Sequence, residues 1–336
     1  MLRLPAFDVA APRDLPGALH LLADPNQGAR PLAGGTDLVP NAKLGQTRLG
    51  TAVLLRNVGG LCGLERRGDH VWIGAGTTLA ELATDPTILE TCAALGRAAA
   101  RVASPQIRNM ATLGGNLCLD TRCRYINQSE FWRSALGGCL KSHGSECHVV
   151  PGGQGCVAAL SSDTAPVLIA YGAVVEVAGW RDGQVARREL PLADLYDSDG
   201  TRHVRLAPGE LLTSVRVPVP GPHVRVGHRK WAVRKSIDFP LISVALRLEL
   251  AGGALVGGRL VVGVLGPRPR VLDLKGLAGR PMGAAFAAEL GRMAFDRCRP
   301  LPNIPYDADY RRERLAVEVR RLALGLLDDP PHCSDA

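Results

Sequence analysis

Four of the nine cysteines in this sequence of 336 residues lie in one short stretch. They are Cys123, Cys139, Cys147 and Cys156, with fifteen, seven and eight residues between successive members. Four thiolates are the ligand set of a 4Fe-4S cluster and also of a structural zinc ion. CxxC pairs, which zinc ribbons typically use, are absent, yet the spacing alone does not separate the two metals. The pattern therefore predicts a metal site of one kind or the other.

The chain around these cysteines is predicted to be a long loop. About forty residues without a clear helix or strand pattern are unusual unless they serve a function, and a bound cluster would give such a loop a centre to fold around. Four side chains are expected to shield that centre, namely Tyr125, Phe131, Trp132 and Leu136. His143 and His148 flank Cys147, and we interpret them as solvated loop histidines rather than ligands. The isolated thiols Cys62, Cys92, Cys298 and Cys333 are interpreted as buried or tail residues.

Two glycine-containing segments form a second group of candidates. They read AGGTDL at 33–38 and TLGGN at 112–116, and each is expected to be a loop that follows a buried stretch. Glycine allows a tight turn whose N–H groups face an anion, so each loop could hold part of a pyrophosphate. Neither segment matches GxGxxG or a P-loop, and each is also compatible with an ordinary turn. Two loops of this kind would suit the two ends of a dinucleotide.

Composition places the chain among globular proteins of two or three domains. Apolar residues make up 46% and charged residues 21%, and no stretch approaches the about 20 apolar residues of a membrane helix. The N-terminus lacks a signal-peptide core, so we expect a cytoplasmic protein with no membrane partner. The net charge of +8 is carried by scattered residues, and aromatic residues are only 4%, which argues against a nucleic-acid partner.

Hydrophobic spacing predicts the elements that must position these candidates. We expect Asp163 near the start of a helix, a hairpin turn at Asp182-Gly183, and a proline-rich linker at 217–223. The remaining predicted elements are helices at 14–23, 88–102, 285–295 and 306–327, and strands at 51–55, 224–232, 241–250 and 255–265.

Three segments together resemble a known family. PLAGGTDLVPNAKLG (31–45), NMATLGGNL (109–117) and SSDTAPVLIAYGAVVEV (161–177) resemble the flavin-binding subunit or domain of the molybdenum hydroxylases, the xanthine dehydrogenase and carbon monoxide dehydrogenase family. The resemblance implies an α+β fold: a two-subdomain PCMH-type FAD-binding domain at 1–218, then a C-terminal domain at 224–328 with a three-stranded antiparallel sheet and helices, and a tail at 329–336. The two subdomains would span about 1–57 and 58–218.

The resemblance also implies which residues hold FAD. It assigns the first glycine segment to the diphosphate and ribityl region of FAD. It assigns residues around the second segment to the second wall of the site, and Asp163 to a polar contact with the flavin. Some relatives place a lysine near the flavin after the linker, and Arg234 and Lys235 are the nearest candidates. The implied FAD residues are Leu32, Ala33, Gly34, Gly35, Thr36, Asp37, Leu38, Val102, Ala103, Thr112, Gly115, Asn116, Cys118 and Asp163.

The cysteine segment, about 120–161, is an insertion relative to most of that family. It resembles the flavin subunit of the 4-hydroxybenzoyl-CoA reductases, which carries an additional 4Fe-4S cluster. This resemblance implies FAD and a 4Fe-4S cluster held by the four cysteines, a molybdopterin-containing large subunit, and a small subunit with two 2Fe-2S clusters. The assembly would be a dimer of heterotrimers that uses ferredoxin as electron donor for reductive dehydroxylation to benzoyl-CoA. No catalytic residue is assigned to this chain, because the substrate chemistry would take place on a partner.

Basic residues in the insertion lead to a further expectation. Arg122, Arg124 and Lys141 would raise the cluster potential and help to dock an acidic ferredoxin. Two alternatives remain open. The chain could be the FAD subunit of a xanthine- or CO-dehydrogenase-like hydroxylase that passes electrons to NAD or quinone and has a zinc-bound insertion, or it could be a zinc-organised scaffold without enzymatic activity.

Overall fold

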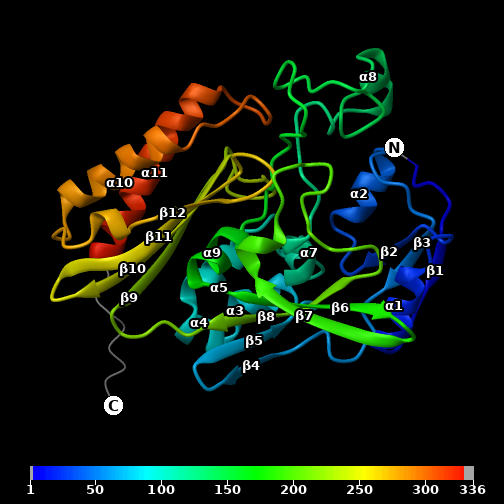
Figure 1. Ribbon diagram of the computed structural model, residues 1–336, viewed down its shortest axis with the longest axis horizontal. Helices are drawn as coiled ribbons and strands as arrows, with labels where there is room; N and C mark the ends of the chain where they lie inside the picture. The colour runs from blue at the N-terminus through cyan, green and yellow to red at the C-terminus, as the bar shows by residue number, and fades with distance from the viewer. Residues whose placement is uncertain (1–2, 329–336) are drawn as a thin grey trace.

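The computed structural model describes residues 3–328, and its strands form three sheets. Figure 1 shows the C-terminal sheet with its helices at one side of the molecule and the N-terminal sheet at the other. The predicted tail at 329–336 lies outside the described residues. No helix in the described range has the length and apolar character that crossing a membrane requires.

The first sheet is small and parallel, with strand order β1-β3-β2. Asp14 caps the first helix at the predicted position, because its carboxylate accepts a hydrogen bond from the Gly17 N–H. The first glycine segment begins where β2 ends, so the sheet fixes one end of that segment. The elements are β1 (Asp8–Ala10), α1 (Leu15–Ala23), β2 (Ala29–Leu32), α2 (Leu38–Lys43) and β3 (Thr51–Leu54).

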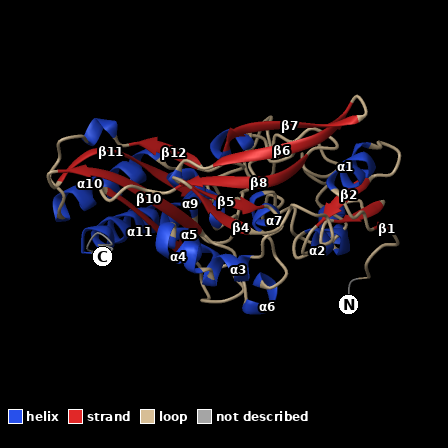
Figure 2. Ribbon diagram, turned by 90° about the horizontal axis from the view of Figure 1, so that it is seen from below, coloured by secondary structure: helices blue, strands red, loops and turns tan. Residues whose placement is uncertain are grey.

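The second sheet has five antiparallel strands in the order β4-β5-β8-β6-β7. The predicted hairpin is confirmed, since Asp182 and Gly183 join β6 to β7 with φ values of 50° and 75°. This hairpin reaches across to α1 (Figure 2), where Ala178 packs in one core cluster with Leu19. The strands are β4 (Leu64–Arg67), β5 (His70–Gly74), β6 (Val174–Arg181), β7 (Gln184–Pro191) and β8 (Leu211–Pro218), with a 3-10 turn at Leu192–Leu195.

Short helices pack on the second sheet and form the largest core with it. The single helix predicted at 88–102 is wrong, because Cys92 has non-helical dihedral angles and divides it into α4 and α5. The second glycine segment is also a helix rather than the predicted loop: Thr112 caps the start of α7. These helices are α3 (Leu79–Thr84), α4 (Pro86–Thr91), α5 (Ala93–Ala100), α6 (Pro105–Arg108), α7 (Leu113–Leu117) and α9 (Thr164–Tyr171).

Helix α9 is buried along its whole length. It contacts β8 of the second sheet and β9, β10 and β11 of the C-terminal sheet, so it lies between the two sheets. A helix that is apolar on all sides is stable only when it is covered on all sides. Helix α9 therefore joins the two domains through a shared core.

The C-terminal sheet has four antiparallel strands in the order β12-β11-β10-β9, with α10 and α11 packed along it (Figure 1). The predicted three-stranded sheet is therefore wrong by one strand. The extra strand, β12, has only four residues, of which three are exposed, so its alternation was too short to detect. The elements are β9 (Val224–Trp231), β10 (Ile242–Ala251), β11 (Ala254–Gly263), β12 (Arg270–Asp273), α10 (Ala284–Arg297) and α11 (Ala308–Asp328), with a 3-10 turn at Lys275–Leu277.

The insertion at 120–161 projects from the rest of the molecule, as Figure 1 shows for the segment labelled α8. Within it the structure assigns one helix, α8 (Glu130–Ala135), which Ser129 caps, and otherwise turns and irregular chain. The expectation of a long loop is thus close to what is observed.

Candidate functional site

A large cleft of about 1820 Å³ runs between the first sheet, α7 and the base of the insertion. The structure brings to its wall every residue that the sequence predicted to hold FAD. A long concave site with a few polar groups is the usual form of a cofactor site. The predicted residues in its wall are Leu32, Ala33, Gly34, Gly35, Thr36, Asp37, Leu38, Val102, Ala103, Thr112, Gly115, Asn116, Cys118 and Asp163.

The first glycine segment packs directly on the chain that leads into α7. A Cβ atom at Gly34 would lie 1.8 Å from the Met110 carbonyl oxygen, so no larger residue fits there. Gly35 has a φ of 71°, which glycine adopts without strain. Both glycine segments consequently belong to one continuous wall.

Asn116 links the second glycine segment to the start of α9. Its Oδ1 atom accepts hydrogen bonds from the hydroxyls of Ser162 at 2.8 Å and Thr164 at 2.7 Å. Thr112 caps α7 by accepting a bond from the Gly115 N–H at 3.1 Å. The two buried bonds to Asn116 fix the position of α7 relative to the start of α9.

Asp163 lies at the start of α9 as predicted, but its carboxylate makes no capping bond there. Instead it accepts a hydrogen bond from the Lys230 ammonium at 2.8 Å, and only 4% of the Asp163 side chain and 7% of the Lys230 side chain are exposed. Burial raises the pKa of Asp163 to about 6, and the nearby Lys230 charge limits that rise. The second carboxylate oxygen, Oδ1, is buried without a partner. This acceptor is available for a ligand in the cleft.

Lys230 was missed by the sequence analysis. Among the described residues, neither Arg234 nor Lys235 lines the cleft, and Arg234 is exposed and paired with Asp238 at 2.5 Å. The residues before Lys230 could have indicated that it points inward. Val226 and His228 lie on the same face of β9 as Lys230, at the two-residue period of a strand, and both pack toward the interior.

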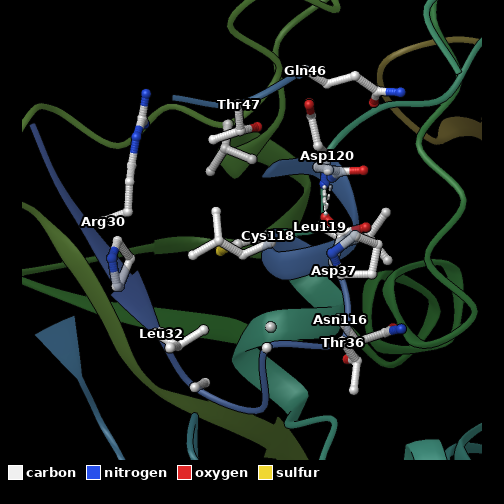
Figure 3. Close-up of a pocket in the computed structure, with 18 of the residues that line it drawn as sticks. Arg30, Leu32, Thr36, Asp37, Gln46, Thr47, Asn116, Cys118, Leu119 and Asp120 are labelled. Carbon is white, nitrogen blue, oxygen red and sulfur yellow. Dashed lines mark hydrogen bonds between the residues drawn. The ribbon is translucent and has the colours of Figure 1, made fainter. Parts of the chain in front are cut away.

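A polar network joins the first glycine segment to the base of the insertion. Asp37 accepts hydrogen bonds from the Arg122 guanidinium at 2.7 Å and from the Asp120 N–H at 2.9 Å. Figure 3 shows Asp37 and Asp120 close together in the cleft wall, with Asn116 and Cys118 on neighbouring parts of the chain. The insertion is therefore attached to the cleft at its first residues.

The four inserted cysteines meet at a second, smaller pocket. Cys123, Cys139, Cys147 and Cys156 all line it, and none forms a disulfide. Within residues 3–328, no three His, Cys, Asp or Glu side chains are grouped closely enough to hold one metal ion. The four cysteines thus line one common pocket.

Burial opposes ionisation of these thiols. It raises the pKa of Cys123, and the neighbouring Cys139 and Cys147 raise it further, while backbone N–H groups lower it. Burial also raises the pKa of Cys156 to about 11, against the lowering effect of the Lys141 charge. Thiolates in this pocket would therefore need a positively charged partner.

Other predictions for the insertion are corrected by the structure. Phe131 is 86% exposed, and Trp132 and Leu136 are also exposed, so of the four expected shielding residues Tyr125 alone lines the pocket. His148, interpreted as solvated, lines the pocket and contacts the Gly138 carbonyl oxygen at 2.5 Å.

The expected basic docking surface is not formed by the residues proposed for it. Arg122 is bound to Asp37, and Lys141 is 10% exposed and bound to Asp120 at 2.5 Å. Arg124 is exposed, with its guanidinium near the ring of Tyr125. Arg122 and Lys141 point inward because they pair with Asp37 and Asp120 in the cleft wall. The sequence around the two basic residues did not reveal these pairs.

Arg133 holds the insertion against the first domain. Its side chain is buried and donates hydrogen bonds to the carbonyl oxygens of Ile126 at 3.2 Å, Gln128 at 2.5 Å and Leu44 at 3.0 Å. Leu44 follows α2 directly, so this residue connects the cysteine segment to the same element that the first glycine segment leads into.

Comparison with known proteins identifies the family. Residues 5–220 match the family model described as the FAD binding domain in molybdopterin dehydrogenase. The chain is 35% identical over 268 residues to the aldehyde oxidoreductase FAD-binding subunit PaoB of Escherichia coli, which covers 76% of this chain and 80% of that protein. It is 27% identical over 321 residues to the carbon monoxide dehydrogenase medium chain of Afipia carboxidovorans, which covers 94% and 95%.

Solved structures give the same fold. The quinoline 2-oxidoreductase structure from Pseudomonas putida 86 matches with a TM-score of 0.77 at 23% identity, covering 96% of this chain and 98% of that chain. Together with the cleft and the two glycine segments, these similarities show that the chain belongs to the FAD-binding subunits of the molybdenum hydroxylase family, which includes aldehyde, xanthine and carbon monoxide dehydrogenases.

Proposed function

We propose that this chain carries electrons, through FAD and a 4Fe-4S cluster, for a molybdenum hydroxylase that oxidises its substrate on a partner subunit. One observation supports the pairing of the two cofactors: Ile126, Leu140 and Lys141 line both the cleft and the cysteine pocket. The two sites therefore share a wall. Groups bound on either side of one layer of side chains are close enough for electrons to pass between them.

The residues present fit FAD. The unpartnered Oδ1 atom of Asp163 offers a buried acceptor to a donor of the ligand. Gly34 lets the first glycine segment pack against Met110, and in this position the segment lines the cleft. When bound, FAD exchanges electrons singly or in pairs and a 4Fe-4S cluster exchanges one at a time. Asp163, held in place by Lys230, would orient the flavin, and Asn116 would hold α7 against it.

Four cysteines could hold a cluster or a zinc ion, and we favour the cluster because the insertion resembles that of the 4-hydroxybenzoyl-CoA reductase flavin subunit. A zinc ion needs four ligands at about 2.0–2.3 Å from one point. All four cysteines line one pocket, and no described group of three potential ligands is arranged to hold one ion. An iron-sulfur cube places its ligands around a larger centre, and its positive irons would offset the cost of ionising buried thiols.

The remaining partners follow from the family. We propose that a molybdopterin-containing large subunit and a small subunit with two 2Fe-2S clusters assemble with this chain, as a dimer of heterotrimers. Aldehyde oxidation has the strongest support as the overall reaction, because the aldehyde oxidoreductase subunit PaoB is the relative with 35% identity over most of the chain. Electrons would then leave through FAD to NAD or a quinone.

A 4-hydroxybenzoyl-CoA reductase is the second candidate, and the cysteine insertion favours it. The structure does not support the basic surface proposed to dock its ferredoxin donor, because Arg122 and Lys141 are bound in internal ion pairs. The named relatives are dehydrogenases, hydroxylases and oxidoreductases, which supports outward electron flow instead.

The test is to purify the assembled complex from its native host and measure its cofactors and electron flow. We expect released FAD, about four iron atoms in this chain, and a cluster signal in electron paramagnetic resonance after reduction. Aldehydes or purines should reduce the flavin. Zinc in place of iron would overturn the cluster, and reduction of 4-hydroxybenzoyl-CoA by reduced ferredoxin, without oxidation of aldehydes or purines, would replace the hydroxylase with the second candidate.

A further inference from the structure

Lys141 occupies the boundary between the two sites. It lines both the cleft and the cysteine pocket, and it lies two residues after Cys139. Its ammonium donates hydrogen bonds to the Asp120 carboxylate, the Thr121 hydroxyl and the Gly200 carbonyl oxygen. With 10% of its side chain exposed, it is held in one place.

The charge of Lys141 acts on the cysteine pocket. Its side chain lines that pocket together with Cys139 and Cys156, so the ammonium is carried beside the proposed ligands. A charge screened little by water acts over a longer range than one at the surface. Asp120 pairs with Lys141 on the cleft side, where it also lies 4.0 Å from His203. The pair is therefore a fixed dipole between the two cofactor sites.

We propose that Lys141 is a positioning residue whose buried charge, set by its pair with Asp120, adjusts the reduction potential of the cluster against that of the flavin. This inference rests on the proposed function. A positive charge favours the reduced, more negative state of a cluster, and a negative charge disfavours it. Lys141 should thus make the cluster a better acceptor from the flavin, and Asp120 should moderate that effect.

The experiment is a potentiometric titration of the assembled complex followed by electron paramagnetic resonance. The cluster potential should fall in Lys141→Met, rise in Asp120→Asn, and stay close to the native value in Lys141→Arg. Arg124→Met is the matched control: it removes a positive charge one residue from Cys123, but from an exposed position, so its shift should be clearly smaller. Opposite shifts from the two partners of one ion pair are not expected of a merely structural bridge.

Each outcome has one meaning. An unchanged potential in Lys141→Met with full iron content overturns the inference while leaving the cluster in place. Should Lys141→Met lose its iron, Asp120→Asn decides: a raised potential supports the inference, and an unchanged or lowered one overturns it. Loss of iron from both variants assigns the pair a structural role and also overturns it. Absence of a 4Fe-4S cluster from this chain in the native complex refutes the proposed function instead.

Discussion

The cleft and the cysteine pocket are adjacent, but they are built in different ways. Strand β2, helix α7 and the residues just before α9 line the cleft, and two hydrophobic core clusters support them. The cysteine pocket lies in a segment whose single assigned helix has six residues, and buried polar side chains such as Arg133 and Lys141 attach it. The first site is thus shaped by the fold itself, whereas the second depends on a few polar contacts and, we propose, on its cluster.

The sharpest test of this difference removes a cysteine ligand. Cys139→Ser or Cys156→Ser should reduce the iron content of the chain from about four atoms to nearly none, because a four-ligand cluster tolerates loss of a thiolate poorly. The FAD content should remain, since the cleft has its own support. Iron and flavin analysis of the purified variants measures both. Cys62→Ser serves as the control, because Cys62 lines the cleft but not the cysteine pocket; retention of full iron in both ligand variants would refute the assignment.

The converse change damages the cleft. Gly34→Ala would place a methyl group against the Met110 carbonyl oxygen, so the two segments must separate at a cost of about 1–3 kcal/mol. We expect FAD to bind at least about tenfold more weakly, which 1.4 kcal/mol would produce, while iron is retained. Gly59→Ala is the matched control, because a Cβ there meets nothing within 4 Å. Native flavin affinity in Gly34→Ala would show that the close approach is unimportant.

Arg133→Met tests the attachment of the insertion. It leaves three carbonyl oxygens without their donor, which should cost about 1–3 kcal/mol locally. Hydrogen exchange and proteolysis should accelerate within 120–161 and remain unchanged in the second sheet. Faster exchange throughout the chain would mean that the insertion and the cleft are one cooperative unit, contrary to the comparison above.

The smallest effect concerns pH. The pKa of Asp163 is raised to about 6 by burial, and a flavin group that donates to its carboxylate would lower that pKa in the complex. Binding then favours the ionised form, so FAD affinity should be full above about pH 6 and fall by at most about tenfold per unit below it. Titrations of the apo-chain with FAD between pH 4.5 and 8 measure this, and Asp163→Asn should remove the dependence. An affinity that rises on acidification would contradict the contact.

The sequence predicts a feature well when the residues that form it are close together along the chain, and poorly when they are far apart. Local signals predicted the first helix, at 14–23, and the turn at Asp182-Gly183, because each depends on neighbouring residues alone. The pair of Asp163 and Lys230 was missed, since it joins α9 to β9 and depends on how two sheets cover one helix.

The error in the second glycine segment has an identifiable cause. The double glycine in α7 disfavours a helix, and the Thr112 cap and tertiary packing overrode that preference. The family resemblance placed residues in the cleft that no periodicity could have found. It did not reveal that Arg122 and Lys141 turn inward, because Asp37 and Asp120, which receive them, lie in the cleft wall.

The burial of α9 on all sides limits how the gene for such a protein can be divided. A polypeptide ending before β9 would present the uncovered side of that helix to water and would leave Asp163 without Lys230. Splitting the chain at the proline-rich linker would therefore yield an aggregation-prone fragment rather than a minimal flavoprotein. Fission of the gene between α9 and β11 would cut this shared core.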